Sequence, residues 1–239
     1  MHHPDHENPF VATPFGTPPG RIEAPSLVQL ATDALRRMIL GGQLRPGERL
    51  IEDRLTEQLG ISRPPLREAL QSLAREGLIT RVPRRGAIVT KLDESDVREI
   101  LDLRAGFERL AVELGVPCDS PERLQRCRQA LRAMQDCAER DDRAQLVERG
   151  YDFHLSIVDL SGHRRLTEFY RSLHQQLLLC MAMNLYTREH HYESLTEHVA
   201  RHEQLLRTIE AGDPQAVLAE LAQHGEGSFT RHLADQEVE

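Results

Sequence analysis

Arg63 and Arg67 lie one helical turn apart in the segment ISRPPLREAL, residues 61–70. Residues four apart share one face of a helix, so both guanidinium groups can approach a target from the same side. Arginine carries a planar fork of donors that fits phosphate oxygens and the edge of guanine. The spacing therefore favours a nucleic-acid contact over the alternative, in which both arginines simply solvate an exposed helix.

The first turn of this helix is predicted to have an unusual cap. Ser62 stands at the N-cap position, and Ile61 and Leu66 occupy the two positions of a hydrophobic staple. A capping serine normally accepts a hydrogen bond from a backbone N–H two or three residues further on, but Pro64 and Pro65 have none. We therefore expect the Ser62 hydroxyl, at the positive end of the helix dipole, to face a phosphate.

The elements around the arginine helix are predicted from periodicity. Apolar spacing indicates helices over 27–39 and 52–59 before it, and alternation indicates strands over 78–82 and 87–90 after it. The turn between the strands contains Arg84, Arg85 and Gly86. Three helices followed by a β-hairpin make a winged helix-turn-helix, and arginines at the hairpin tip would reach the DNA backbone or the minor groove.

Charge is divided unevenly along the 239 residues. Residues 26–91 carry twelve Arg or Lys against seven Asp or Glu, whereas residues 92–239 carry 17 against 28, within a net charge of −8. A basic module joined to an acidic one is typical of a nucleic-acid reader with a separate second domain. We predict a winged-helix DNA-binding domain over 26–91, an effector-binding and dimerisation domain over 92–239, and a disordered, proline-rich leader over 1–25.

The second domain is predicted to be an all-α antiparallel bundle, which makes the whole chain mainly α. Turns at Pro117, Gly162 and 212–214 separate the predicted helices. These helices span 94–114, 121–140, 144–161, 164–186, 192–211 and 214–233.

Histidine is concentrated in this second domain. Nine of the 12 histidines fall at or after residue 154, on consecutive predicted helices. Neutral imidazole is a common ligand of zinc and related ions, and helical bundles assemble metal sites from facing helices. By spacing alone His198 and His202 are the best pair, because residues i and i+4 share a face. The alternative is that several of these are ordinary core or surface histidines.

Three motifs in the basic module occur in register. They are GQLRPGERL (G-x-L-x-P-G-x-x-L), SRPPLREAL (S-R-x-P-x-R-E-A-L) and PRRG (P-x-R-G). Over its whole length the module resembles the DNA-binding domain of the GntR family of bacterial transcription regulators. The resemblance implies DNA contacts by Ser62, Arg63, Arg67, Arg84, Arg85 and Gly86. Pro64 stands where the family usually has a polar residue, so we expect a phosphate contact to be lost there.

Two segments of the acidic module, FHLSIVDLSGHRRL and RHEQLLRTIEAGDPQAVLAELAQH, resemble the FCD ligand-binding domain of the FadR-like subfamily of these regulators. Many members hold a divalent metal with one Asp and three His. The resemblance places the three histidines at His154, His202 and His224, which makes His198 a bystander. The position of the Asp is Gly150 here, and Asp152 lies roughly 200° further round the helix and cannot simply substitute.

Arg104, in LDLRAGFERLA, matches a recurrent arginine of the same domain. The resemblance makes it a candidate clamp for an effector carboxylate. The alternative is a salt bridge to Glu108 across one turn of the same helix. Three imidazoles without the carboxylate can still hold an ion, zinc or nickel, and leave positions open for water or for an oxygen-rich effector.

We therefore expect a DNA-binding transcription regulator, a repressor, that binds a short inverted-repeat operator as a homodimer and responds to a small-molecule effector, a carboxylate. A regulator that senses the metal itself is the first alternative. A metal-dependent enzyme is the second, and it is disfavoured because no H-E-x-x-H motif is present. The four cysteines form no C-x-x-C pair, and no apolar run approaches the roughly 18 residues of a membrane span, so we expect a cytoplasmic protein.

Overall fold

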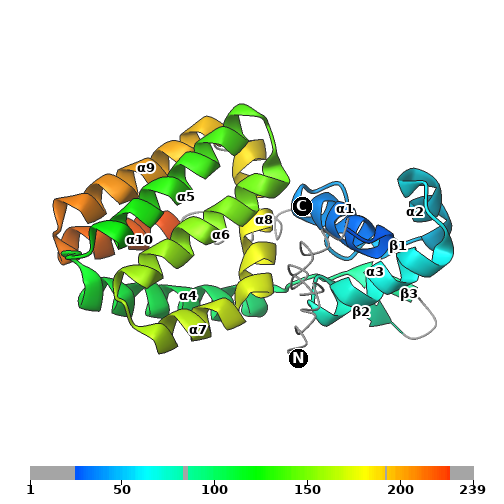
Figure 1. The fold of residues 1–239 in the computed structure, drawn as a ribbon, viewed down its shortest axis with the longest axis horizontal. Coiled ribbons are helices and arrows are strands. Elements are labelled where there is room, and N and C mark those ends of the chain that lie inside the picture. Colours follow the sequence, from blue (N-terminus) through cyan, green and yellow to red (C-terminus); the bar gives the residue numbers. More distant parts are fainter. Residues whose placement is uncertain (1–24, 83–85, 192, 227–239) are drawn as a thin grey trace, which may run out of the picture.

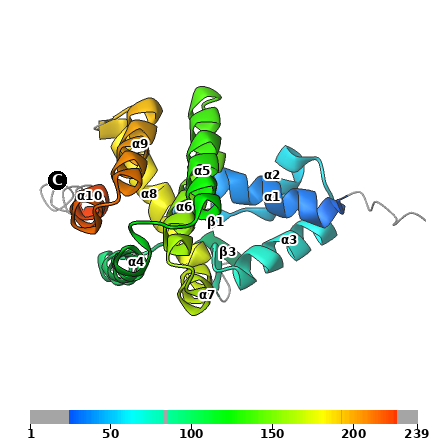
Figure 2. The ribbon, with the colours of Figure 1, turned by 60° about the vertical axis from the view of Figure 1, so that its left-hand side comes forward.

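The structure is a computed structural model that describes residues 25–82, 86–191 and 193–226. In this part of the chain a small head, built from three helices and a three-stranded sheet, adjoins a larger body of seven helices (Figure 1). A second view shows the helices of the body stacked beside the head (Figure 2). The mainly α fold class predicted from the sequence is confirmed.

The head is assembled from α1 (Leu27–Leu40), α2 (Glu52–Leu59) and α3 (Arg63–Arg75). Ser26 caps α1, and its Oγ accepts a hydrogen bond from the backbone N–H of Gln29. Gly60 ends α2 at a φ of 63°, a left-handed conformation that favours glycine, and so turns the chain into α3. The inward faces of α1 and α3 meet in a core that includes Leu35 and Leu73, both fully buried.

The sheet of the head has one strand more than the sequence predicted. Besides β2 (Ile79–Val82) and β3 (Gly86–Val89), the two-residue strand β1 (Arg49–Leu50) pairs with β3, so that the strand order is β1-β3-β2 with antiparallel neighbours. Two residues are too few to show alternation, so only the pairing with β3 reveals the strand. The predicted leader and the wing tip at 83–85 lie outside the described residues, apart from Pro25.

The body contains every remaining helix of the described chain. They are α4 (Glu94–Gly115), α5 (Pro121–Glu139), α6 (Arg143–Leu160), α7 (Arg164–Ser172), α8 (His174–His191), α9 (Leu195–Ala211) and α10 (Pro214–Glu226). The central helix α6 packs against α4, α5, α7 and α8. Its side chains Phe153, Ile157 and Val158 are fully buried. At the end of α4, a Cβ on Gly115 would lie 2.5 Å from the Ser161 backbone nitrogen, so only glycine permits this close approach.

The prediction of a single helix over 164–186 is wrong, because the helix is interrupted at Leu173, which separates α7 from α8. Leu173 is neither glycine nor proline, so no local signal marks the break. Its consequence is visible in Figure 1, where α8 turns away from the direction of α7 and runs along the edge of the body that faces the head. Helix α9 begins at Leu195, three residues later than predicted, because Ser194 and Glu197 form a capping box.

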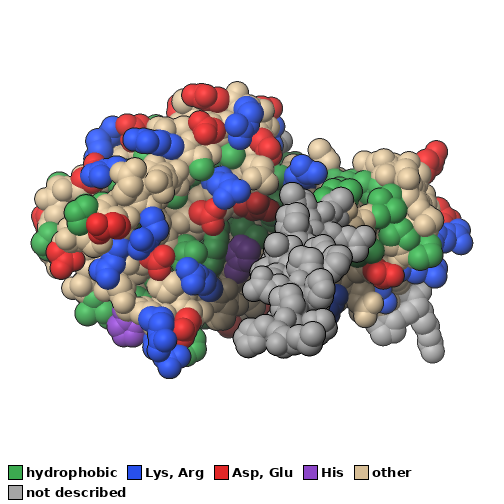
Figure 3. Space-filling model, in the orientation of Figure 1, with side chains coloured by type: hydrophobic (Ala, Val, Ile, Leu, Met, Phe, Trp, Pro, Cys, Tyr) green, Lys and Arg blue, Asp and Glu red, His purple; other side chains and the backbone are tan. Residues whose placement is uncertain are grey.

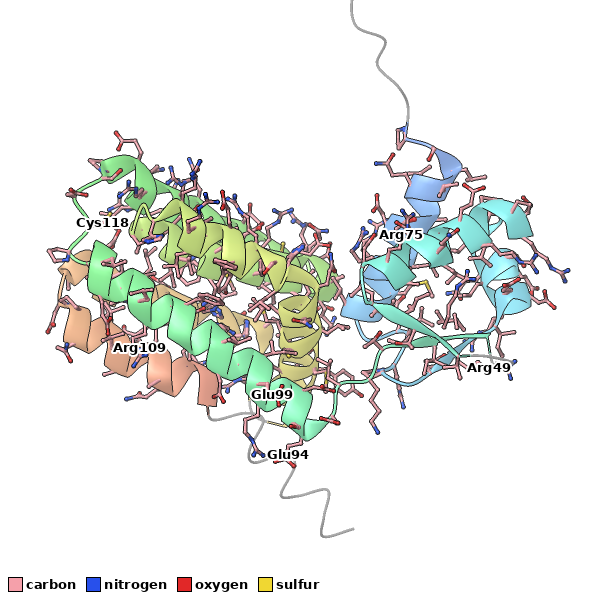
Figure 4. All side chains as sticks on the ribbon, turned by 90° about the horizontal axis from the view of Figure 1, so that it is seen from below. Arg49, Arg75, Glu94, Glu99, Arg109 and Cys118 are labelled. Carbon is pink, nitrogen blue, oxygen red and sulfur yellow. The ribbon has the colours of Figure 1, made fainter. Side chains whose placement is uncertain are left out.

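The head and the body meet through α1, which packs against α6 and α8. A cavity of about 580 Å³ lies between them, and its walls include Leu92, Val97 and Met183. Figure 4 shows that α4 starts near the head at Glu94 and leads to Cys118 at the far end of the body. None of the helices in the described residues is long and apolar enough to cross a membrane.

Candidate DNA-binding surface and buried histidine centre

The two arginines of α3 project from one exposed face of the head. Arg63 Nη2 donates to Asp53 Oδ1 at 2.8 Å, and Arg67 Nε donates to Glu52 Oε2 at 2.9 Å. Both arginine side chains are 61 % exposed. Ion pairs this exposed contribute little to stability, so both guanidinium groups are available to a more strongly charged partner such as DNA.

The cap of α3 has the geometry that the sequence predicted. Ser62 is the N-cap residue, and its side chain makes no capping hydrogen bond because Pro64 and Pro65 occupy the first turn. Leu66 is fully buried, and Ile61 packs against the same core, as the two halves of a hydrophobic staple do. The Ser62 hydroxyl is thus free of the helix cap, and its contact with phosphate stays a prediction.

The wing carries the remaining predicted DNA contacts. Arg84 and Arg85 lie outside the described residues. Gly86 opens β3 at a φ of 85°, where a residue other than glycine is strained. Over the body, Figure 3 shows basic and acidic side chains intermixed on the visible face.

Three histidines from different helices converge inside the body. His154 on α6, His202 on α9 and His224 on α10 are buried, and each offers a ligand atom within 4.8 Å of the others. His224 Nε2 lies 3.1 Å from His202 Nε2. The cavity that they line has a volume of only about 20 Å³, enough for one or two water-sized groups.

Neighbouring acceptors orient two of these imidazole rings. His202 Nδ1 donates to the backbone oxygen of His198 at 2.8 Å, which leaves its Nε2 as an acceptor toward His224. His154 Nδ1 lies 3.1 Å from Glu108 Oε1. Hydrogen bonds of this kind hold the ligating histidines of metal sites in one tautomer and one orientation.

Arg104 stands beside the histidines as part of a buried network. Its Nε donates to Glu108 Oε1 at 2.8 Å, and its Nη2 lies 2.8 and 2.7 Å from the two ring nitrogens of His154. The hydroxyl of Tyr170 donates to the same Glu108 oxygen at 3.2 Å. The predicted salt bridge between Arg104 and Glu108 is therefore present, together with a contact to His154 that the sequence did not reveal.

Burial and the Arg104 charge set the protonation of this centre. Burial, and next the Arg104 guanidinium, lower the pKa of His154 to about 4. Burial also brings the pKa values of His202 and His224 well below their usual range, so all three rings are neutral near pH 7. For Glu108 burial acts to raise the pKa, but Arg104 and His154 outweigh it and lower the pKa to about 2.

The position of the missing carboxylate lies in the wall of the same cavity. A Cβ on Gly150 would meet Met181 Cε at 3.4 Å and Met134 Cε at 3.8 Å, which are ordinary contacts with flexible side-chain ends. Asp152 is paired with Arg149 at 2.7 Å and is not among the residues that line the cavity. Asp152 is therefore not placed to supply the missing ligand, as its position round the helix predicted.

His198 belongs to a second ion cluster, which sequence reasoning missed. Glu193 accepts hydrogen bonds from Arg188 at 2.7 Å and Arg201 at 2.7 Å, and its Oε1 lies 3.2 Å from His198 Nδ1. These contacts lower the pKa of Glu193 well below its usual range, against the effect of burial. His198 thus lines the histidine cavity but turns to Glu193, so the pair chosen by spacing alone is not the converging pair. Nothing local in the sequence marks Glu193.

The three imidazoles fit a divalent ion. Two nitrogens bound to one ion at about 2.0–2.1 Å lie about 2.9 to 3.4 Å apart, and the His202 and His224 nitrogens are 3.1 Å apart. All three rings are neutral, as ligands must be, and two are oriented by acceptors. Arg104 Nη2 competes with an ion for His154, so the guanidinium has to turn away before that ring can become a ligand.

An exposed arginine helix on a winged head, joined to a helical domain, defines a winged-helix DNA-binding protein. The chain matches the gntR family of bacterial regulatory proteins over residues 27–89 and the FCD domain over residues 99–227. It therefore belongs to the GntR family, as a DNA-binding transcription regulator with a C-terminal FCD domain. The members of this family are transcription regulators and not enzymes.

Curated relatives agree with this assignment. The uncharacterized HTH-type transcriptional regulator YdhC of Bacillus subtilis (strain 168) is 32 % identical over 187 residues, which cover 77 % of this chain and 83 % of YdhC. The HTH-type transcriptional regulator McbR of Escherichia coli (strain K12) is 30 % identical over 212 residues, 85 % of this chain and 93 % of McbR. The solved structure of E. coli McbR/YncC has a TM-score of 0.60 and 27 % identity, and the match covers 90 % of this chain and 99 % of that one.

Proposed function

We propose that this regulator binds its operator as a homodimer and releases it when a small carboxylate binds in the body, beside a divalent ion held by His154, His202 and His224. Zinc and nickel are the expected ions, because both accept imidazole ligands. Since a DNA-binding regulator acts where the chromosome is, we place the protein in the cytoplasm.

The observation that carries the proposal is the buried guanidinium next to the three histidines. Arg104 Nη2 contacts the neutral ring of His154. A carboxylate is a stronger partner for arginine than a neutral imidazole, because it carries the opposite charge and can accept two parallel N–H bonds from the guanidinium fork. A carboxylate that draws Arg104 away frees His154 for the ion, so effector and metal should bind cooperatively.

The charge balance also supports an anionic effector. Arg104 and Glu108 neutralise each other as an ion pair, and the histidine ligands are neutral. A divalent ion would then keep its full charge, because Gly150 supplies no carboxylate. An anion that completes the coordination removes that excess positive charge from a buried site.

Helix α8 offers a route from the buried centre to the head. Met181 and Leu185 line the histidine cavity, whereas Met183 and Tyr186 line the cavity between head and body. A Cβ placed on Gly42 of the head would lie 3.3 Å from the Tyr186 ring, so the two are in close contact. A ligand that shifts α8 therefore changes how the head sits, which alters DNA affinity only if the two arrangements bind the ligand differently.

An apolar stripe on α4 supports the homodimer. Leu103, Leu110 and Leu114 are 50 %, 41 % and 54 % exposed, and their spacing places them along one face of the helix. Such a face is buried most simply against its copy in a two-fold dimer. A two-fold dimer presents two recognition helices, which calls for a short inverted-repeat operator. Sedimentation equilibrium tests the dimer directly.

Repression is the mode that similar proteins support. The gluconate operon transcriptional repressor of Bacillus subtilis (strain 168) is 27 % identical over 192 residues, 80 % of this chain and 78 % of the repressor. This chain would likewise act as a repressor if it binds its operator without the effector and releases it when the effector binds.

The test is a titration of the operator-bound protein with small carboxylates, with and without equimolar zinc or nickel, followed by fluorescence anisotropy of labelled DNA. We expect release by a carboxylate at a lower concentration when metal is present, and a matching rise in metal affinity when the carboxylate is present. Release by metal alone would instead favour the metal-sensing alternative, which the small cavity supports because about 20 Å³ admits an ion more readily than an organic acid.

A further inference from the structure

The cavity that holds the three histidines also contains an unsatisfied oxygen. Asn184, on α8, lines this cavity, and its Oδ1 is buried without a hydrogen-bond partner among the described residues. A buried acceptor with no donor is destabilising, so such a group in a folded chain points to a ligand that satisfies it.

The place of Asn184 complements the place of the missing ligand. Gly150 faces α8, because a Cβ there would meet Met181 Cε at 3.4 Å. Asn184 lies three residues beyond Met181 on the same helix and lines the same cavity. The side of the cavity next to Gly150 is therefore bounded by the helix that carries the unsatisfied oxygen.

The occupant of this cavity has to be small. Its volume of about 20 Å³ holds one or two water-sized groups, and its lining brings together three neutral imidazoles and one amide oxygen. Imidazole nitrogen and amide oxygen are both metal ligands, and an amide oxygen binds without a proton to lose. A divalent ion bound by both kinds of donor would satisfy the unpaired oxygen and the histidines at once.

We infer that Asn184 Oδ1 is the oxygen ligand of this chain's metal site and takes the role left vacant at Gly150. The inference rests on the metal site proposed above. It adds a consequence for the effector: the ligand set of three imidazoles and one amide is uncharged, so the ion keeps its full double charge for an anion.

Metal binding to the full-length protein tests the inference without any DNA readout. Zinc affinity is measured by competition with a chromogenic chelator, and coordination is followed by the visible absorption of bound Co²⁺. We expect Asn184→Leu to lower zinc affinity at least tenfold and to change the Co²⁺ spectrum, because leucine has a similar size to asparagine but supplies no ligand atom. Asn184→Asp should raise zinc affinity at least tenfold, because it adds a charge at the same atom.

Gln175 provides a matched control on the same helix. Its Oε1 is also buried without a partner among the described residues, but it lies in a different cavity, which contains Arg36 and His174 and none of the three converging histidines. Gln175→Leu should leave zinc affinity and the Co²⁺ spectrum unchanged. Circular dichroism of each metal-free variant verifies that it is folded.

Failure of this inference is distinguishable from failure of the metal site. If Asn184→Leu leaves both readouts unchanged while His202→Ala abolishes metal binding, the histidine site stands and Asn184 is not its ligand. If His202→Ala also leaves zinc affinity unchanged, the proposed metal site is wrong and this inference falls with it. A spectrum that changes in Asn184→Leu and in Gln175→Leu alike overturns the specific role of Asn184.

Discussion

Arg63 and Arg67 in the head and Arg104 in the body all pair with carboxylates, but the head pairs are exposed to solvent and the Arg104 pair is buried. Arg63 and Arg67 are 61 % exposed and pair with Asp53 and Glu52 across to α2. The side chain of Arg104 is 11 % exposed and pairs with a Glu108 side chain that is 5 % exposed. Exposed pairs contribute about 0–1 kcal/mol, whereas breaking a buried pair costs about 3–5 kcal/mol.

This difference separates two uses of arginine. The head arginines give up their partners at little cost, which suits groups that transfer to DNA each time the protein binds. Arg104 can leave its surroundings only for another buried anion, which suits a group that responds to one chemical class of ligand.

Removing the buried arginine should give the largest loss of stability. Arg104→Ala leaves the Glu108 carboxylate buried without its cation, so we expect the free energy of unfolding to fall by about 3–5 kcal/mol in urea denaturation. Arg98→Ala is the matched control, because Arg98 also pairs with a glutamate one turn away on α4, Glu94, but is 67 % exposed. That variant should lose no more than about 1 kcal/mol. Equal losses in the two variants would contradict the contrast.

Acidification should destabilise the metal-free protein through the histidines. His154 has a pKa of about 4 when folded, under the influence of burial and Arg104, and about 6.5 when unfolded. The unfolded chain therefore binds the proton first, and stability present above pH 6.5 is lost as the pH falls toward 4. The expected slope is up to about 1.4 kcal/mol per pH unit from this group, with contributions of the same sign from His202 and His224.

Thermal melts of wild type and His154→Gln between pH 7 and 4.5 measure this effect. Within this range Glu108 contributes little, because its stabilisation begins to be lost only as the pH falls through the unfolded pKa of about 4.3 and is fully lost below its folded pKa of about 2. The melting temperature of the variant should fall less steeply with decreasing pH than that of wild type. Parallel curves would show that His154 does not carry the dependence.

Loss of a head arginine should weaken DNA binding without destabilising the fold. Arg67→Ala is expected to cost about 1–3 kcal/mol on a specific operator and to relax base preference, because a base-edge contact is lost. The free energy of unfolding should change by no more than about 0.5 kcal/mol, since the side chain is exposed. Anisotropy titrations at physiological salt, against specific and scrambled DNA, measure both affinities.

Alanine substitutions of two other arginines serve as controls for the effect of Arg67→Ala on DNA binding. Arg75, at the opposite end of α3 (Figure 4), is exposed and should tolerate alanine with little change in affinity. Arg84→Ala, in the turn that the sequence predicts as the wing tip, should weaken binding to all DNA sequences more evenly. If Arg67→Ala protects the operator like wild type in a footprint, α3 is not the recognition helix.

Restoring the family carboxylate should have the smallest effect. Gly150→Asp adds an anionic ligand where the new Cβ meets only Met181 and Met134 at ordinary contact distances. Metal affinity should rise on the order of tenfold in chelator competition. An unchanged affinity would mean that a carboxylate at this position does not reach the ion, and that Asn184 is the oxygen ligand by itself.

The winged head was largely determined by its local sequence. Ser62, the two prolines and the staple of Ile61 with Leu66 specify how α3 begins, and the i,i+4 spacing of Arg63 and Arg67 specifies a common face. These are interactions within one or two turns, so the sequence predicts them without knowledge of the rest of the chain. The strand β1 was not predicted, because its two residues are recognisable as a strand only through their pairing with β3.

The buried centre required the tertiary structure. His154 and Arg104 are 50 residues apart, and His202 and His224 are 22 apart, so the angles at which α4, α6, α9 and α10 cross decide that they meet. The sequence supplied the residue types, and the resemblance to a family selected three of nine histidines. Only packing turned His198 toward Glu193, broke the chain at Leu173, and placed α8 with its unsatisfied Asn184 oxygen beside Gly150. Such contacts depend on the relative positions of whole helices, which no local periodicity encodes.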